Sequence, residues 1–412
     1  MSPNTEFIPF ARPDISEAEV EAVQRVLRSG WLTTASETAA FEREFAAAAG
    51  VPHAMAVNSA TSGLHLALEA LAVGPGDRVV LSPYTFTSTA EVIRYLGADP
   101  LFVDVDPCTR NLCPDQLAET LTREATPRGR AKQRGHARQR GRVAAVIAVH
   151  IAGAPCDMTA IIAIARQYGI PVVEDAAHSL PWPPEGPPVG TEGDIGVYSF
   201  YATKPIAVGE GGMVVTRDDQ TAQRVRLMRL HGIDRDVWNR YHSSTPSWQY
   251  DVVEAGYKYN LPDTAAAIGR VQLARSAELR EARARIAARY RDRITAAGIV
   301  GQAGVELPVD DPRHSHHLFI LSVGDGATPT QRDMMITRLT ELGIGTSVHY
   351  RPLHLMTYYR SRYRLTPNDF PHALAAYHRA LSLPLYSGLN ESMVERISDA
   401  VIDAHRASMQ DG

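Results

Sequence analysis

Three short segments carry residues whose types and spacing could do chemistry, and the first suits a phosphate group. Asn58-Ser59-Ala60-Thr61-Ser62-Gly63 lies between an apolar run at 54–57 and a helical pattern at 63–71. Free backbone amides and the helix dipole at such a junction favour a bound phosphate. The segment matches neither the P-loop pattern nor GxGxxG, which disfavours an NTPase or a dinucleotide-binding protein. By itself, the junction is equally consistent with a purely structural role.

An acidic residue in the second segment, Val172-Val173-Glu174-Asp175-Ala176-Ala177-His178, suits a pyridine nitrogen. Asp175 lies where an apolar strand ends, and ligands bind at such strand ends in open α/β sheets. A carboxylate there can keep a pyridine nitrogen protonated and so make the ring an electron sink. Asp175 alone is explained more simply as the cap of a helix.

A lysine in the third segment could act as a nucleophile. Lys204 ends Tyr198-Ser199-Phe200-Tyr201-Ala202-Thr203-Lys204, and the turn Gly209-Glu210-Gly211-Gly212 follows it. Partial burial and nearby positive groups would lower its pKa and leave a neutral amine able to attack a carbonyl. A lone lysine is most often a surface residue. Chance nevertheless produces all three features in this order, a phosphate site, a pyridinium partner and a lysine, far more rarely than any one of them.

The elements that must position these residues are those of an α/β fold. Mostly unalternated apolar runs alternate with helical patterns, which predicts a mostly parallel sheet covered by helices on both faces. The runs lie at 54–57, 78–81, 101–105, 143–149, 171–174, 195–200 and 212–216, and the helical patterns at 63–71, 87–96 and 158–168. Before them, a capping box at Ser16–Glu19 opens a helix that Gly30 ends.

The pattern changes after Pro262. A long Ala- and Arg-rich helical stretch covers about 265–297, and it is followed by a strand at 318–323, a helix near 331–342 and a strand at 346–350. We therefore expect a large cofactor-binding α/β domain over residues 1–262, and a linking long helix with a smaller C-terminal α+β domain over 263–412. A chain of 412 residues is also longer than one hydrophobic core usually supports.

The composition is that of an ordinary globular enzyme, with 44% hydrophobic and 21% charged residues. A net charge of −4 gives no pull toward nucleic acid or an anionic membrane. No apolar run approaches the roughly 20 residues that span a bilayer, and the N-terminus lacks the pattern of a signal peptide. Three cysteines without a CxxC pair suit a reducing compartment. We expect a cytoplasmic protein without a nucleic-acid or membrane partner.

Two clusters of basic residues receive no catalytic assignment. Eight Lys or Arg residues lie between Arg123 and Arg142 with Glu124 as the only acid, which indicates a solvated insertion loop more than a patch for polyphosphate or nucleic acid. His314, His316 and His317 have no acid or cysteine that completes a metal-ligand set. For them we expect no metal site and favour a substrate-side or structural role.

Further motifs along nearly the whole chain resemble those of one family. They are Ser29-Gly30-Trp31-Leu32-Thr33-Thr34, Ser82-Pro83-Tyr84-Thr85-Phe86, Val103-Asp104-Val105-Asp106, Val149-His150-Ile151-Ala152-Gly153-Ala154-Pro155 and Gly256-Tyr257-Lys258-Tyr259-Asn260-Leu261-Pro262-Asp263. The chain resembles the fold-type-I sugar aminotransferases, also described as the DegT/DnrJ/EryC1/StrS family. This resemblance implies pyridoxal 5'-phosphate as cofactor, pyridoxamine 5'-phosphate as an intermediate, and transamination of a nucleotide-linked keto sugar.

The same resemblance implies roles for single residues. Lys204 would be the catalytic Schiff-base lysine, which also moves the proton, and Asp175 would pair with the pyridine nitrogen. The other residues that would hold the cofactor are Ala60, Thr61 and Ser199 at its phosphate, Phe86 on one ring face, and His178 at the 3-hydroxyl side or ring face. Asn260 would reach the phosphate of the neighbouring subunit's cofactor, so the active unit would be a homodimer. The candidate substrate residues are Thr33, His349 and Tyr350.

Within this family, a histidine at the position of His178, in Glu-Asp-Ala-Ala-His, resembles the branch that aminates 4-keto sugars. The 3-keto branch more often carries glutamine at this position. The runs 228–232, 256–261, 317–320 and 343–350 look like the aminotransferase that makes 4-amino-4-deoxy-arabinose on a nucleotide. The resemblance therefore implies amination of a 4-keto sugar with glutamate as amino donor. In a departure from the family, Pro205 follows the lysine where asparagine is common.

Three alternatives stay open at this point. The first is a 3-keto sugar aminotransferase with the same fold and cofactor. The second is a sugar dehydratase, against which Lys204 argues because related dehydratases carry histidine at that position. The third is a cofactor-sensing regulatory protein, which usually carries an added nucleic-acid-binding domain that this sequence does not suggest.

Overall fold

The computed structural model describes residues 6–125, 141–184, 186–234, 250–301, 304–324 and 328–410. In these residues, seven strands form one sheet in the order β1-β7-β6-β5-β4-β2-β3. The strands are β1 (His53–Val57), β2 (Arg78–Leu81), β3 (Asp99–Phe102), β4 (Val143–Val149), β5 (Val172–Asp175), β6 (Ile195–Ser199) and β7 (Gly212–Thr216). Neighbours from β3 to β6 pair in parallel, and β7 is antiparallel to both of its neighbours. The prediction of a mostly parallel sheet is confirmed.

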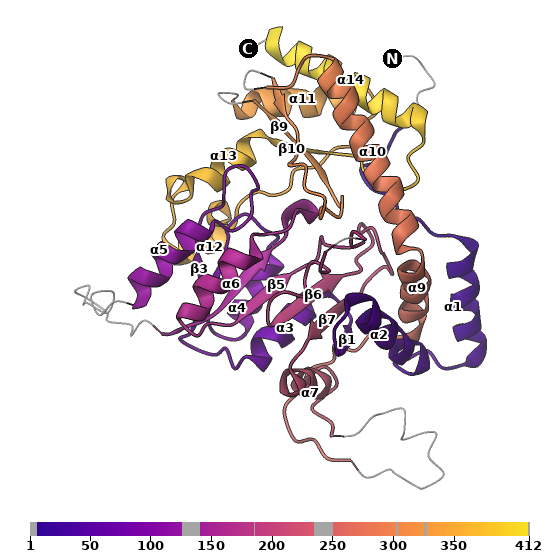
Figure 1. The fold of residues 1–412 in the computed structure, drawn as a ribbon, viewed down its shortest axis with the longest axis vertical. Helices are drawn as coiled ribbons and strands as arrows, with labels where there is room; N and C mark the ends of the chain where they lie inside the picture. Colours follow the sequence, from indigo (N-terminus) through magenta and orange to yellow (C-terminus); the bar gives the residue numbers. More distant parts are fainter. Residues whose placement is uncertain are drawn as a thin grey trace.

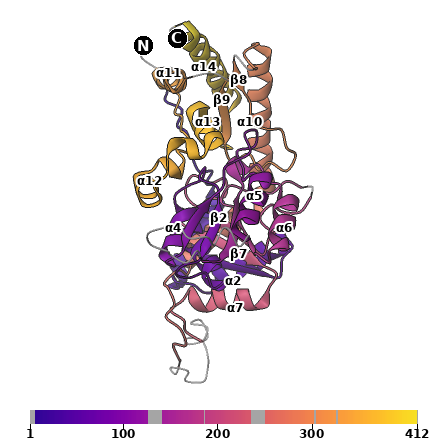
Figure 2. The same cartoon turned by 90° about the vertical axis from the view of Figure 1, so that its left-hand side faces the viewer.

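Both faces of this sheet are covered by helices, which explains why its strands are apolar at consecutive positions. In β4, Ile147 packs into the cluster on one face, while Val146 and Ala148 pack into the cluster on the other. Helices α3 (Ala60–Ala70), α4 (Ser88–Tyr95) and α7 (Asp219–Met228) contribute to the first cluster. The opposite face is covered by α2 (Ser36–Ala49), α5 (Pro114–Ala125) and α6 (Met158–Gln167) (Figure 2).

After Pro262, α9 (Asp263–Ala274) packs against α2 beside the large sheet, and most of the chain that follows lies above that sheet (Figure 1). Three antiparallel strands lie in the order β10-β9-β8 within the described residues, with bounds Ala380–Leu383, Phe319–Val323 and Val305–Glu306. The helices of this part are α9 (Asp263–Ala274), α10 (Ser276–Ala296), α11 (Pro329–Glu341), α12 (Thr357–Tyr363), α13 (Pro371–Arg379) and α14 (Glu391–Gln410). This arrangement matches the expected smaller α+β part. The domain boundary at residue 262 stays a prediction.

The N-terminal helix α1 (Glu17–Ser29) begins and ends where the sequence predicts. The backbone N–H of Ser16 donates to the carboxylate of Glu19 at 2.8 Å, which closes the capping box. Gly30 takes the left-handed conformation, with φ of 73°, that ends the helix. The strands of the large sheet lie within one residue of the predicted runs, except that β3 spans 99–102 rather than 101–105.

Two predictions in the C-terminal part need correction. The stretch expected over 265–297 is helical, but it is broken between α9 and α10, where Arg275 pairs with Asp14 at 2.8 Å and with Glu19 at 3.0 Å. Those partners are distant in sequence, so no local signal announces the break. The strand expected at 346–350 is reduced to one bridge between Ser347 and Ser382, because the chain leaves the sheet there and lines a cavity.

The predicted basic segment lies largely at 126–140, outside the described residues. No helix in the described part of the chain is both long and apolar enough to cross a membrane.

Candidate active site

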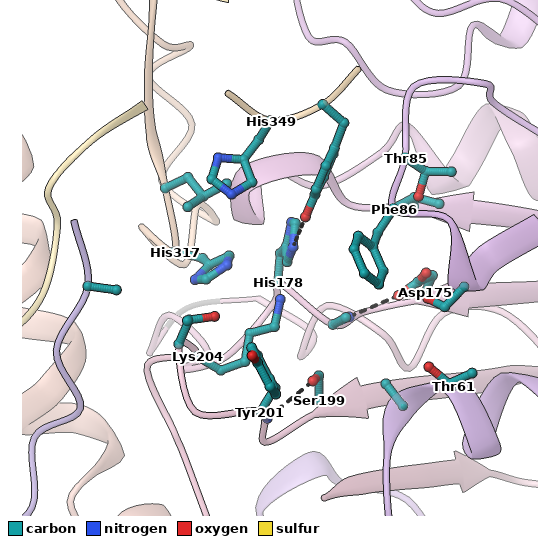
Figure 3. A pocket seen from close by; sticks show the side chains of 18 of the residues that line it. Thr61, Thr85, Phe86, Asp175, His178, Ser199, Tyr201, Lys204, His317 and His349 are labelled. Carbon is teal, nitrogen blue, oxygen red and sulfur yellow. Dashed lines mark hydrogen bonds between the residues drawn. The ribbon is translucent and has the colours of Figure 1, made fainter. Parts of the chain in front are cut away.

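A cavity of about 590 Å³ opens at the carboxyl ends of β5 and β6, between the large sheet and the C-terminal part (Figure 3). We call it the Lys204 cavity. It brings together most of the residues that the sequence singles out: Ala60, Thr61, Phe86, Asp175, His178, Ser199, Lys204, His349 and Tyr350. These residues come from positions up to 290 apart in the chain (60 to 350), so their meeting is a property of the fold.

One end of the Lys204 cavity is an anion site at the start of α3. Ser59 caps this helix by accepting a hydrogen bond from the Ser62 amide at 3.1 Å. The amides of Ala60 and Thr61 lie in the first turn, where backbone N–H groups have no partner within the helix. Gly212 lets β7 approach this turn, since a Cβ atom there would lie 2.7 to 2.8 Å from Ser59 and Ala60 backbone atoms. Together these features suit a phosphate group.

Asp175 lies buried at the floor of the cavity, at the end of β5. Its Oδ2 accepts a hydrogen bond from Thr89 Oγ1 at 2.9 Å, and its Oδ1 accepts one from the Ala177 amide at 3.2 Å. Burial raises the pKa of this carboxyl group, while the two hydrogen bonds and the charge of Lys204 oppose that rise. A positive partner in the cavity would favour the ionised carboxylate.

Lys204 extends from the turn after β6 into the same space. Its backbone N–H donates to the Tyr201 carbonyl at 2.8 Å, which fixes the start of the side chain. Burial lowers the pKa of the amine to about 8, and the charge of Asp175 acts in the opposite direction. About a tenth of this amine is therefore neutral at pH 7 and can attack a carbonyl carbon.

The tautomer of His178 follows from its two hydrogen bonds. Burial lowers the pKa of His178 well below its ordinary value, so the ring carries one proton. Its Nδ1 accepts a hydrogen bond from the Ala152 amide at 3.2 Å, which places that proton on Nε2. The Nε2–H then donates to the hydroxyl oxygen of Tyr350 at 3.0 Å. The hydroxyl proton of Tyr350 is thereby left free to point at a ligand.

The lining residues that were not among the predicted site residues include Thr85, Tyr201 and His317. Thr85 and Tyr201 belong to motifs that the sequence singles out, and His317 belongs to the histidine cluster. His314 and His316 stack on each other with ring centroids 4.9 Å apart, whereas His317 packs against His178 at 4.4 Å. No group of side chains in the described residues has the composition of a metal site.

Asn260 and Thr33 do not join the others, because they line a second cavity of about 630 Å³, which we call the Asn260 cavity. Asn260 Nδ2 donates to Thr34 Oγ1 at 2.7 Å, and its Oδ1 accepts from Lys258 Nζ at 2.6 Å. Arg226 and Arg229 line the same space. Among the described residues around the Lys204 cavity, by contrast, Lys204 is the one lysine and there is no arginine.

The residues of the Lys204 cavity fit pyridoxal phosphate. The start of α3, which Gly212 leaves unobstructed, suits the phosphate of the cofactor. The buried carboxylate of Asp175 suits its pyridinium nitrogen, and the amine of Lys204, whose pKa is lowered, suits its aldehyde.

Comparison with known proteins agrees with this geometry. The model of the DegT/DnrJ/EryC1/StrS aminotransferase family matches residues 13–402. The spore coat polysaccharide biosynthesis protein SpsC of Bacillus subtilis is 41% identical over 398 residues, covering 96% of this chain and 97% of SpsC. The UDP-4-amino-4-deoxy-L-arabinose–oxoglutarate aminotransferase of Shewanella sediminis is 37% identical over 403 residues, covering 97% and 98% of the two chains.

Solved structures are similar over the same length. The putative sugar aminotransferase Spr1654 from Streptococcus pneumoniae in its PMP form has a TM-score of 0.85 and 29% identity, covering 97% of this chain and 100% of that one. The PLP form of the same protein has a TM-score of 0.84.

Proposed function

This chain belongs to the DegT/DnrJ/EryC1/StrS aminotransferase family and is a pyridoxal-phosphate-dependent sugar aminotransferase, and on that basis we propose that it aminates the 4-keto group of a nucleotide-linked sugar with glutamate as donor. The observation that carries the proposal is one cavity that holds Lys204 and Asp175 beside the open start of α3. When bound, pyridoxal phosphate supplies an electron-withdrawing ring that stabilises negative charge on the carbon next to the transferred nitrogen.

We assign the cofactor contacts to the residues that line the Lys204 cavity. Ala60, Thr61 and Ser199 bind the phosphate, through backbone amides at the start of α3 and a hydroxyl at the end of β6. Asp175 stays ionised opposite the pyridinium nitrogen, supported by its bonds from Thr89 and Ala177. Phe86, more than half exposed at the cavity, covers one face of the ring. His178 lies at the 3-hydroxyl side.

Lys204 is the residue that takes up and returns the proton during transfer. A pKa of about 8 allows its Nζ to hold a proton in one step and release it in the next at neutral pH. His349 and Tyr350 orient the substrate from the other side of the cavity. The bond from His178 leaves the Tyr350 hydroxyl as a donor toward a substrate oxygen.

Two observations support the choice of a 4-keto sugar and of glutamate. The first is the histidine at position 178, which is similar to the 4-keto branch of the family. The Shewanella sediminis relative is named for a 4-amino sugar and for oxoglutarate, which is the keto acid that glutamate becomes when it gives up its amino group.

We further propose that the active unit is a homodimer in which Asn260 reaches the phosphate of the partner's cofactor. Phosphates and carboxylates of the two substrates call for cations, and the Lys204 cavity offers only Lys204 among its described lining. Arg226, Arg229 and Lys258 lie instead around the Asn260 cavity, together with Thr33. A two-fold arrangement would join the two cavities.

A cytoplasmic location is supported by three cysteines that form no disulfide: Cys108, Cys113 and Cys156.

The test is product analysis with a panel of 3-keto and 4-keto nucleotide sugars and glutamate. We expect mass spectrometry to find nitrogen installed on 4-keto sugars only. Amination of 3-keto sugars alone would contradict the proposed position, and release of a deoxygenated keto sugar without nitrogen would indicate a dehydratase. Sedimentation of the holoenzyme at low concentration tests the dimer, and a fully active monomer would contradict it.

A further inference from the structure

Three imidazoles from the described part of the chain line the Lys204 cavity, and they differ in the partners that they already have. His178 uses both ring nitrogens, toward Ala152 and Tyr350. His349 uses Nδ1, which lies 2.8 Å from Ser382 Oγ. His317 is 5% exposed, and its Nδ1 is closed off from solvent without a hydrogen-bond partner among the described residues, so Nε2 is the ring nitrogen that can meet a ligand in the cavity. Buried polar side chains almost always have a partner, so this one calls for an explanation.

The position of His317 is enforced by its backbone. The guanidinium of Arg283, on α10, donates to the carbonyl oxygens of His316 at 2.8 Å and His317 at 2.7 Å. The Leu318 amide donates to the Ala152 carbonyl at 3.1 Å, which ties the segment to the wall of the cavity. The ring then lies against His178 on the side facing Lys204 (Figure 3). These backbone hydrogen bonds therefore fix the position of the His317 ring.

The electrostatic surroundings keep this imidazole neutral. Burial lowers the pKa of His317 well below its ordinary value, and Lys204, His178, Arg283 and His349 all act in the same direction. A neutral imidazole presents one donor and one acceptor. A hydroxyl group also presents both, whereas a carboxylate only accepts and is held best by a cation.

We propose that His317 hydrogen-bonds a hydroxyl group of the sugar substrate and so acts in the sugar half of the reaction but not in the amino-acid half. This role rests on the proposed function, since it needs a sugar in the Lys204 cavity. It makes His317 a specificity-determining residue in addition to His349 and Tyr350. A hydroxyl group can bond either tautomer of this imidazole, because it both donates and accepts, whereas the carboxylates of glutamate only accept and its ammonium group only donates.

The test separates the two half-reactions of the holoenzyme by stopped-flow absorbance of the cofactor. One arm mixes the pyridoxal phosphate form with glutamate, and the other mixes the pyridoxamine phosphate form with a 4-keto nucleotide sugar. His317→Phe keeps a ring and removes both nitrogens, and we expect it to lower kcat/KM in the sugar arm by about tenfold or more. In the glutamate arm we expect a change within about twofold.

Two further variants separate contact from folding. His317→Asn retains a donor and an acceptor and should recover part of the loss in the sugar arm. His314→Asn is the matched control, because His314 is a buried histidine of the same segment that does not line the cavity. It should leave both arms unchanged.

Equal losses in both arms for His317→Phe would overturn the proposal, since they would indicate a structural role. An unchanged sugar arm would overturn it as well. If the wild-type protein takes nitrogen from glutamate but transfers it to no sugar, the proposed function fails and this role fails with it. A wild-type protein that aminates the sugar and a His317→Phe variant that does so equally well would refute the role of His317 alone.

Discussion

The two walls of the Lys204 cavity differ in charge and in the backbone that carries them. The sheet wall, formed by Ala60, Asp175, Ser199 and Lys204, combines ionisable groups with a helix start, and its residues lie at the ends of α3, β5 and β6 or, for Lys204, in the turn after β6. The C-terminal wall, formed by His317, His349 and Tyr350, consists of neutral hydrogen-bonding groups on irregular backbone. Charged groups near the ends of helices and strands suit chemistry common to many substrates, whereas neutral hydrogen-bonding groups on connecting segments suit the choice of one sugar.

If this division is correct, sheet-wall variants should impair both half-reactions and C-terminal-wall variants mainly the sugar half. The largest effect is expected for Lys204→Ala, which removes the nucleophile. We expect activity to fall by several orders of magnitude and the long-wavelength absorption of lysine-bound cofactor to vanish. Lys258→Arg, which changes a lysine of the Asn260 cavity and keeps its positive charge, should keep that absorption. An unchanged spectrum in Lys204→Ala would remove the basis of the comparison.

Asp175→Asn should have the next largest effect, because the amide cannot stabilise a positive pyridine nitrogen. We expect both half-reactions to slow by roughly 100-fold or more, as for other groups that stabilise charge in an active site. Thr89→Val, which removes one hydrogen bond to Asp175, should give a smaller loss of the same kind. Single-turnover rates measure both, and a loss confined to one half-reaction would contradict the division.

Gly212→Ala tests the phosphate end of the sheet wall. The new Cβ would lie 2.7 to 2.8 Å from the backbone of Ser59 and Ala60, so the start of α3 must move. We expect the affinity for pyridoxal phosphate to fall by roughly tenfold to 100-fold, a loss of about 1.4 to 2.8 kcal/mol. Gly74→Ala, at a glycine with open space around it, should leave the affinity unchanged. Equilibrium dialysis with the cofactor provides the measurement.

Tyr350→Phe is the corresponding test of the C-terminal wall. It removes a donor to the substrate and leaves the Nε2–H of His178 without its acceptor. We expect kcat/KM for the sugar to fall by about tenfold and the free energy of unfolding by about 1–2 kcal/mol. The glutamate half-reaction should change little. Tyr358→Phe, at a half-exposed tyrosine outside the cavity, is the control.

The smallest effect concerns pH. Burial lowers the pKa of Lys204 to about 8, and only the neutral amine attacks the cofactor aldehyde. Uptake of pyridoxal phosphate by the apoprotein should therefore accelerate about fivefold from pH 7 to pH 8 and level off above pH 9. The unfolded chain binds this proton more tightly, so the apoprotein should also become more stable between pH 8 and about 10.5. A rate that rises unabated to pH 10 would place the amine in solvent.

Much of the fold could be predicted from sequence because local pattern decides it. Each of the seven apolar runs forms a strand of the large sheet, since a strand buried on both faces must be apolar throughout. The break at Arg275 and the irregular segment 346–350 could not be predicted. Both depend on partners far along the chain: Asp14 and Glu19 for the first, and Ser382 for the second.

The sequence by itself determined which residues could do the chemistry, because Lys204, Asp175 and the phosphate turn lie in short local motifs at strand and helix ends. Only the tertiary structure decided which other residues share the cavity with them. It selects His317 from three histidines to line the cavity, and it pairs His178 with Tyr350 across 172 residues. It also sets Asn260 apart in its own cavity. These choices depend on how the C-terminal part packs over the sheet edge, which no local periodicity encodes.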